Sequence, residues 1–253
     1  MADQEQAQQE SPQGPPFYKR PEVLRPEAHA NLGINGSKRT FKFAKDASFV
    51  AVNGAEFEMA AKHYPVIFSS GADVVPIAVF GLGDRGNLYV NKKGAWEKDH
   101  YIPEYVRRYP FIFMQTNTET QEFALSVDMG DDEVVAEHAE QPFFLNGNPT
   151  EFTNRALEFC KTFHQQHVAT QNFVKFLQEN ELLTERHAEY TPPNNQTVPI
   201  ANFLAVDEEK FNDLSDAVFG EIRKRGYLRP ICGHLSSLIN FSRTYERAAG
   251  IRT

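Results

Sequence analysis

Two adjacent arginines, Arg107 and Arg108, lie in an aromatic-rich stretch of the chain, WEKDHYIPEYVRRYPFIF (residues 96–113). A guanidinium group stacks on ring faces and binds a carboxylate at two points. One arginine of such a pair usually points to solvent, which leaves the other to find an anion. That anion is either an internal carboxylate, with Asp128 or Asp207 as the candidate, or a carboxylate on a ligand.

A bound ligand would also need walls. Tryptophan and tyrosine supply large rings whose polar tips require a hydrogen-bond partner once they are buried. The segment ICGHLSSL (231–238) adds a histidine and serines on a predicted helix, although its small residues equally suit close packing of that helix. The predicted ligand-binding set is Trp96, Tyr101, Tyr105, Arg107, Arg108, His234 and Ser237, and no catalytic residue is assigned.

A second constellation has the spacing of metal ligands. Cys160, His164 and His167 are four and three residues apart on a predicted helix, so all three could face one way. A thiolate with two imidazoles suits zinc, but the sequence offers no evident fourth ligand nearby. The alternative, which we favour, is a core cysteine with two solvated histidines. We expect no cofactor.

Gly81, Gly83 and Gly86 spell G-x-G-x-x-G after a strand-like run. A dinucleotide site requires a helix to follow, with its N-terminus facing the pyrophosphate. The next residues, NLYV (87–90), have a strand pattern instead. We therefore expect a turn between two strands here and no bound nucleotide.

Composition excludes several classes of function. The chain has 253 residues, of which 41% are hydrophobic and 24% charged, as in ordinary soluble globular proteins. Its net charge of −8 argues against nucleic-acid binding, which needs clustered Lys and Arg. No apolar run approaches the ~20 residues of a membrane helix, and no signal-peptide core is evident. We expect a cytoplasmic protein without a membrane span, with non-classical export as the alternative.

Hydrophobic periodicity divides the chain into parts. Residues 1–16 are rich in Gln, Glu and Pro and are predicted to be a disordered tail. Residues 17–38 are predicted to be an extended arm. The predicted fold class is α+β: a β-rich half (39–148), mainly an antiparallel sheet, packs against a helical half (149–247), most simply as one interlocked domain.

The individual elements follow from the same patterns. Short runs rich in Val, Ile, Phe and Tyr, separated by turns, predict strands that include 40–44 and a hairpin of 111–116 with 122–128. Helical periodicity predicts a long helix over 149–179 with a break near 168–170, a second helix over 207–225 and a last one over 228–245.

Six patches occur in order over residues 40–245: HYPVIFS (63–69), PIAVFGLGDRGNLYV (76–90), GAWEKDHYIPEYVRRYPF (94–111), TQNFVKFLQENELL (170–183), FLAVDEEKFNDL (203–214) and GYLRPICGHLSSLIN (226–240). Together they resemble the SapC family, which is named after a surface-layer-associated protein. The resemblance implies a soluble bacterial protein without an established catalytic activity. It also implies an accessory role in nutrient uptake, because members are often encoded near TonB-dependent receptors and flavin-dependent halogenase-like proteins. It carries over no catalytic motif.

Three functions remain open at this point. The leading hypothesis is a binding or accessory protein that holds a small-molecule or peptide ligand in a Phe-rich pocket, or docks a protein partner. The second is an enzyme whose site lies where Arg107 or Arg108 meets the C-terminal helices, with a His, Cys or Asp converging on the arginine. The third is a structural surface-layer component. The sequence predicts no oligomeric state.

Overall fold

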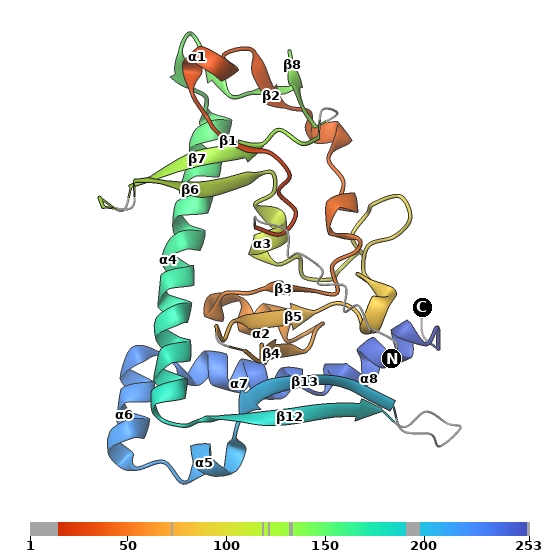
Figure 1. Ribbon diagram of the computed structural model, residues 1–253, viewed down its shortest axis with the longest axis vertical. Coiled ribbons are helices and arrows are strands. Elements are labelled where there is room, and N and C mark those ends of the chain that lie inside the picture. The colour runs from red at the N-terminus through yellow and green to blue at the C-terminus, as the bar shows by residue number, and fades with distance from the viewer. Residues whose placement is uncertain are drawn as a thin grey trace, which may run out of the picture.

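The computed structural model describes residues 15–251, except 72, 118, 121, 132–133 and 191–197. The tail predicted over residues 1–16 lies outside this part of the chain, apart from its last two residues. One helix, α4 (Glu151–Glu179), runs along one side of the molecule for most of its length (Figure 1). Its 29 residues span about 43 Å at 1.5 Å per residue.

Helix α4 begins at a polar cap and continues without interruption. The Thr150 side chain accepts a hydrogen bond from the Thr153 amide at 3.3 Å, which satisfies one of the unpaired donors at the helix start. The predicted break near 168–170 is wrong. The Thr170 hydroxyl donates to the Gln166 carbonyl at 2.7 Å within the helix, so this β-branched residue is accommodated.

Antiparallel strands from both halves of the chain form the largest sheet. Its order is β12 (Leu183–Tyr190), β13 (Val198–Val206), β4 (Val66–Phe68), β5 (Pro76–Val79) and β3 (Phe49–Ala51). Strands β12 and β13 follow α4 in sequence, yet they join strands that precede it. The predicted α+β class is therefore confirmed, with this pair of strands inside the helix-rich half.

Three smaller sheets lie toward the N-terminal end of α4, away from β12 and β13 of the largest sheet (Figure 1). The first contains β1 (Pro21–Val23), β7 (Glu122–Asp128) and β6 (Phe111–Asn117), and it confirms the predicted hairpin. The second contains β8 (Val135–Glu137), β2 (Leu32–Ile34) and β9 (Gln141–Pro142). The third pairs β10 (Phe144–Leu145) with β11 (Asn148–Pro149). Residues 17–38, expected as an extended arm, supply β1, β2 and α1 (Pro26–His29).

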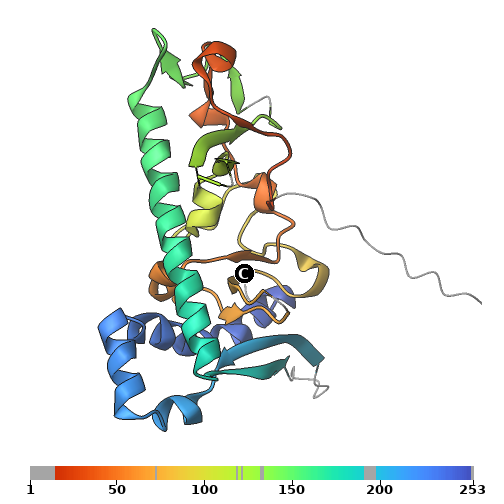
Figure 2. The ribbon, with the colours of Figure 1, turned by 60° about the vertical axis from the view of Figure 1, so that its left-hand side comes forward.

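Two predicted C-terminal helices are each divided. Residues 207–225 form α5 (Glu208–Asn212) and α6 (Asp216–Arg225), because Asp207 and Ser215 each cap a separate helix start. Gly226 ends α6 in the left-handed conformation at φ 74°, as glycine readily does. The last predicted helix divides into α7 (Leu228–Ser237) and α8 (Asn240–Ala248). Figure 2 shows these helices gathered around the lower part of α4.

Two local predictions in the β-rich half are wrong. Residues 42–44 form a 3-10 turn within the strand expected over 40–44. The glycine motif forms another 3-10 turn over Gly83–Arg85, and the following residues make no strand beyond a single bridge between Val90 and Trp96. In the described chain, no helix is both long and apolar enough to cross a membrane.

The aromatic segment 96–113 is interior, as the sequence indicated. The exposed fractions of Trp96, Tyr105 and Phe111 are 8%, 8% and 7%. The Trp96 ring packs edge-on against Phe80 near the large sheet, whereas Tyr105 and Phe111 pack against phenylalanines of α4. Helix α3 (Glu104–Arg107), at the centre of this segment, is therefore held between the strands and α4.

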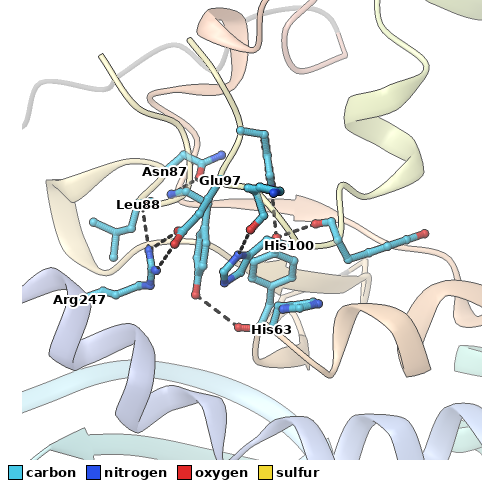
Figure 3. A network of polar contacts seen from close by, with 11 residues as sticks. His63, Asn87, Leu88, Glu97, His100 and Arg247 are labelled. Carbon is cyan, nitrogen blue, oxygen red and sulfur yellow. Dashed lines mark hydrogen bonds and ion pairs between the residues drawn. The ribbon is translucent and has the colours of Figure 1, made fainter. Parts of the chain in front are cut away.

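The loop around Glu97, which precedes α3, is also tied to the C-terminal helix α8 (Figure 3). Arg247 binds both carboxylate oxygens of Glu97, at 2.6 and 2.8 Å, which is the two-point geometry that suits arginine. Close by, the rings of His63 and His100 lie 4.8 Å apart. These contacts fix the loop that positions α3.

Candidate functional site

A cavity of about 650 Å³ lies between α4 and the β-rich half of the chain. It gathers residues from two of the predicted constellations, namely Tyr105, Arg108, Cys160, His164 and His167. We call it the α4 cavity. The sequence placed the first two residues in a ligand site and the other three in a separate metal group.

The long axis of the α4 cavity follows the helix. Its helical wall runs from Cys160 to Gln178, which is about 27 Å at 1.5 Å per residue. The opposite wall comes from Val52 after β3, from residues 73–76 at the start of β5, and from Ile112 in β6. The cavity is therefore an elongated groove with one helical side and one strand side.

Arg108 has an aromatic rather than an ionic environment. Its guanidinium carbon lies 4.4 Å from the ring centres of both Tyr105 and Phe163 and 5.6 Å from that of Tyr18. Its Nε atom is buried and has no hydrogen-bond partner. Among the described residues, no carboxylate forms an ion pair with Arg108. Aromatic faces hold the cation in place, and the guanidinium also hydrogen-bonds the Tyr18 and Tyr105 hydroxyls, which leaves the buried Nε–H available for an anion.

The carboxylates expected as internal partners are used elsewhere. Asp128 is fully buried and accepts hydrogen bonds from the amides of Lys19 and Arg20, at 3.1 and 2.6 Å, and from the Tyr109 hydroxyl at 2.9 Å. Asp207 caps α5 through its side chain. Neither Asp128 nor Asp207 therefore forms the expected ion pair with Arg108.

Arg107 takes the solvent side of the pair. It lies 3.4 Å from Glu104 and donates its Nε–H to the Ile102 carbonyl at 2.9 Å. Its guanidinium also lies over the rings of Tyr101 and Phe159, at 5.8 and 5.5 Å. It does not line the α4 cavity. The two arginines thus have different surroundings although they are adjacent in sequence.

The charge of Arg108 acts on its neighbours in the cavity. Burial raises the pKa of the Cys160 thiol to about 12, and the nearby Arg108 charge only partly opposes this effect. Burial also raises the pKa of Tyr105, again with Arg108 acting in the opposite direction. The pKa of His167 is lowered, first by burial and then by His164 and Arg108. Burial therefore favours the neutral forms of Cys160, Tyr105 and His167 beside the Arg108 cation.

The metal interpretation gains no support from this geometry. In the part of the chain that the structure describes, no three His, Cys, Asp or Glu side chains converge closely enough to hold a metal ion. Cys160 is only 2% exposed, and the raised pKa keeps its thiol protonated, whereas metals bind the thiolate. The His164 ring packs against Phe123 with the ring centres 4.4 Å apart.

Four other predicted ligand-binding residues lie outside the α4 cavity. The Trp96 indole donates to the Tyr64 hydroxyl at 3.2 Å within the core. The Tyr101 hydroxyl donates to the buried carboxylate of Glu56 at 2.9 Å. His234 and Ser237, on α7, are fully buried and bond to the backbone of the large sheet.

His234 occupies a gap between two strands. Strands β4 and β13 pair at Phe68 and Leu204, so Val66 and Val206 would pair next. The His234 ring lies there instead. Its Nδ1–H donates to the Val66 carbonyl at 2.7 Å, and its Nε2 accepts from the Val206 amide at 3.0 Å. These partners assign the neutral tautomer, and they make the residue structural.

Sequence reasoning missed several residues of the cavity wall. Tyr18 of the N-terminal arm stacks on Arg108, and Pro15, just before the arm, lines the α4 cavity. Asn53 lines it after β3. No local pattern distinguishes these residues, because they reach the cavity through long-range pairing. The hydrogen bonds from the Lys19 and Arg20 amides to Asp128 are one example.

The comparison with protein families agrees with the resemblance noted in the sequence. The sequence model of a family described as SapC matches residues 24–243. The chain belongs to the SapC family. No match was found among curated proteins or among solved structures. Within this SapC-family chain, the matched region contains Arg108 and the whole of α4.

Proposed function

We propose that this SapC-family chain is a binding protein that holds a small molecule or a short peptide in the α4 cavity through a carboxylate on the ligand. The observation that carries the proposal is the buried Nε of Arg108, which has no hydrogen-bond partner. An unsatisfied buried donor is unfavourable, and one on a charged group more so, unless a ligand supplies the acceptor.

The physical setting favours such a ligand. A volume of about 650 Å³ lies in the range of small-molecule sites. The cavity walls mix apolar side chains, such as Val52 and Val174, with amides and imidazoles. A carboxylate bound to Arg108 would be partly shielded from water, which strengthens a charge-assisted hydrogen bond. Apolar parts of the ligand would then extend along α4.

An accessory role in nutrient uptake is part of the same proposal. It rests on family membership, and the cavity supplies its physical basis because a binding protein for a nutrient needs an enclosed, selective site. A protein partner that receives the ligand would complete this role.

The Arg108→Gln variant is expected to bind carboxylate ligands about ten- to a hundredfold more weakly than the wild type, because a charge-assisted bond contributes roughly 1.5–3 kcal/mol. The measurement is a thermal-shift and titration panel of aliphatic, aromatic and dipeptide carboxylates, each paired with its amide. The wild type should prefer the acid of at least one pair. The Arg108→Gln variant should lose that preference.

The matched control is Arg107→Gln, which removes the same charge from the neighbouring position outside the α4 cavity. It should keep the wild-type preference for the acid. If both variants lose carboxylate affinity to the same extent, the effect comes from overall charge and the proposal fails. The proposal also fails if Arg108→Gln retains the full acid preference.

A catalytic use is the second candidate, because Cys160, His164 and His167 line the same cavity as Arg108. This convergence is the feature expected of an enzyme. The raised pKa of the thiol argues against a nucleophilic cysteine. Within the described residues, no hydrogen bond joins Cys160 to either imidazole.

Alkylation distinguishes the two candidates. At pH 8, iodoacetamide is expected to modify the exposed Cys232 readily. The buried Cys160 should react on the order of a thousandfold more slowly than an ordinary thiol, because the reactive species is the thiolate and the raised pKa makes it rare. Peptide mass spectrometry follows both sites in one sample, so Cys232 serves as the internal control. Rapid modification of Cys160 in the folded protein would favour the enzyme.

A further inference from the structure

A second cavity, of about 310 Å³, lies on the other side of Arg108 and Cys160 from the α4 cavity, and these two residues line both. Four arginines line it: Arg39, Arg107, Arg108 and Arg155. We call it the arginine cavity. Among the described residues that line it, none is an aspartate or a glutamate. This concentration of positive charge is unusual in a chain whose net charge is −8.

Each of these guanidinium groups keeps unused donors. Arg39 uses Nη2 for the carbonyls of Arg107 and Tyr109. Arg155 contacts Glu151 through Nη1 at 3.2 Å, in an exposed pair that contributes little. A guanidinium has five N–H donors, so each group has several left in the part of the chain that the structure describes. Arg107 pairs with Glu104 at 3.4 Å, so Arg39 and Arg108 are the two guanidinium groups of this cavity without an ion pair among the described residues.

The floor of the cavity is apolar. Phe111, Phe152 and Phe159 line it together with Ala156. Phe111 is buried at 7% exposure, and its ring packs against Phe152 at 5.6 Å. Water is thereby excluded from one side of the arginines, which strengthens their interaction with an anion. It also strengthens their mutual repulsion while no anion is bound.

We infer that the arginine cavity binds a phosphate-class dianion, either as inorganic phosphate or as the terminal phosphate of a larger molecule. A carboxylate has two oxygens and one charge, so it matches one guanidinium fork. Four guanidinium groups around one small volume match a tetrahedral group with several acceptor oxygens and nearly two charges. Bidentate arginine contacts are the usual means of recognising that geometry.

This site goes beyond the proposed function. Arg39, Arg107 and Arg155 do not line the α4 cavity, and Arg155, which pairs with Glu151 on α4, can be changed without removing a contact to the backbone beside Arg108. Of the described lining residues, Arg108 and Cys160 alone are shared between the two cavities. The two proposals can therefore fail separately: loss of phosphate binding in an Arg155 variant says nothing about carboxylate binding at Arg108.

The test is isothermal titration of the full chain with inorganic phosphate and with phenyl phosphate, in a phosphate-free buffer of fixed salt. The wild type is expected to bind at least one of them at one site. Arg39→Gln and Arg155→Gln should each weaken that binding about tenfold, the effect of losing one charge-assisted contact. Arg223→Gln, an exposed arginine of α6, is the charge-matched control and should bind as the wild type does.

The two ligands distinguish the sources of the phosphate. Tighter binding of phenyl phosphate indicates the phosphate of an organic molecule whose apolar part rests on the phenylalanines. Equal or weaker binding indicates the free ion. The inference is overturned if neither ligand binds, or if Arg39→Gln and Arg155→Gln bind as tightly as Arg223→Gln. Circular dichroism of every variant confirms that the fold is retained.

Discussion

The His234→Ala variant is expected to lose about 3 to 5 kcal/mol of the free energy of unfolding. The substitution leaves the Val206 amide without its acceptor and removes a fully buried ring that packs against Phe68. Urea denaturation measures the loss as a lower midpoint with an unchanged slope. Ser236→Ala, on the exposed side of the same helix, should change stability by less than about 0.5 kcal/mol.

The same residue makes stability depend on pH. Burial lowers the pKa of His234 to about 4, with the hydrogen bond to Val66 acting against this effect. An unfolded histidine titrates near 6.5, so between these values the unfolded chain binds the proton and the native chain does not. The contribution of His234 is therefore complete above pH 6.5 and is lost as the pH falls toward 4, about 3 kcal/mol in all. The stability of His234→Asn should lack this pH-dependent component. If the free energy of unfolding of the wild type and of His234→Asn changes equally with pH, the assignment is contradicted.

The Asp128→Ala variant is expected to lose about 3 to 5 kcal/mol and to release the N-terminal arm. Its carboxylate accepts from two arm amides and from the Tyr109 hydroxyl, so removing it leaves three donors unsatisfied. The residue just before the arm also contacts the α4 cavity wall, since the Tyr105 hydroxyl donates to the Pro16 carbonyl at 3.1 Å. Carboxylate affinity should therefore fall together with stability.

Limited trypsin digestion measures the release of the arm. Cleavage after Lys19 should be faster in Asp128→Ala than in the wild type, under conditions where both proteins remain folded. Asp46→Ala, which removes an exposed carboxylate, is the control and should be cut at the wild-type rate. Equal cleavage of all three proteins would show that Asp128 does not hold the arm.

The sequence predicted those features that depend on local composition. The interior position of Trp96, Tyr105 and Phe111 follows from their large apolar rings, and the hairpin of β6 and β7 follows from its strand patterns. The α+β class follows from the change in periodicity near residue 149. Each of these predictions rests on burial of apolar area, which a single sequence reveals well.

Other features depend on competition between neighbours. The helix predicted over 207–225 was wrong because Asp207 and Ser215 both act as caps, and periodicity alone does not detect a second helix start. His234 was placed in a ligand site because a histidine near serines suggests chemistry. Only the tertiary structure shows that it fills a gap between β4 and β13.

The candidate site combines both situations. The sequence indicated the pair Arg107 and Arg108 without deciding which of them meets an anion. The hypothesis that Asp128 pairs with one of them could not anticipate that the amides of the N-terminal arm bind this carboxylate. Cys160, His164 and His167 line one cavity, and their use as a site stays a prediction. Their meeting with Arg108 required the packing of α3 against α4, which no local pattern specifies.

Native mass spectrometry of the purified protein tests the central claim most directly. We expect the wild type and Arg107→Gln to carry a small molecule whose fragmentation shows a carboxylic acid, and Arg108→Gln to be free of it. If Arg108→Gln keeps the same bound molecule at wild-type occupancy, the account is contradicted. The ligand would then be held without Arg108, the one cation of the α4 cavity that lacks an ionic partner among the described residues.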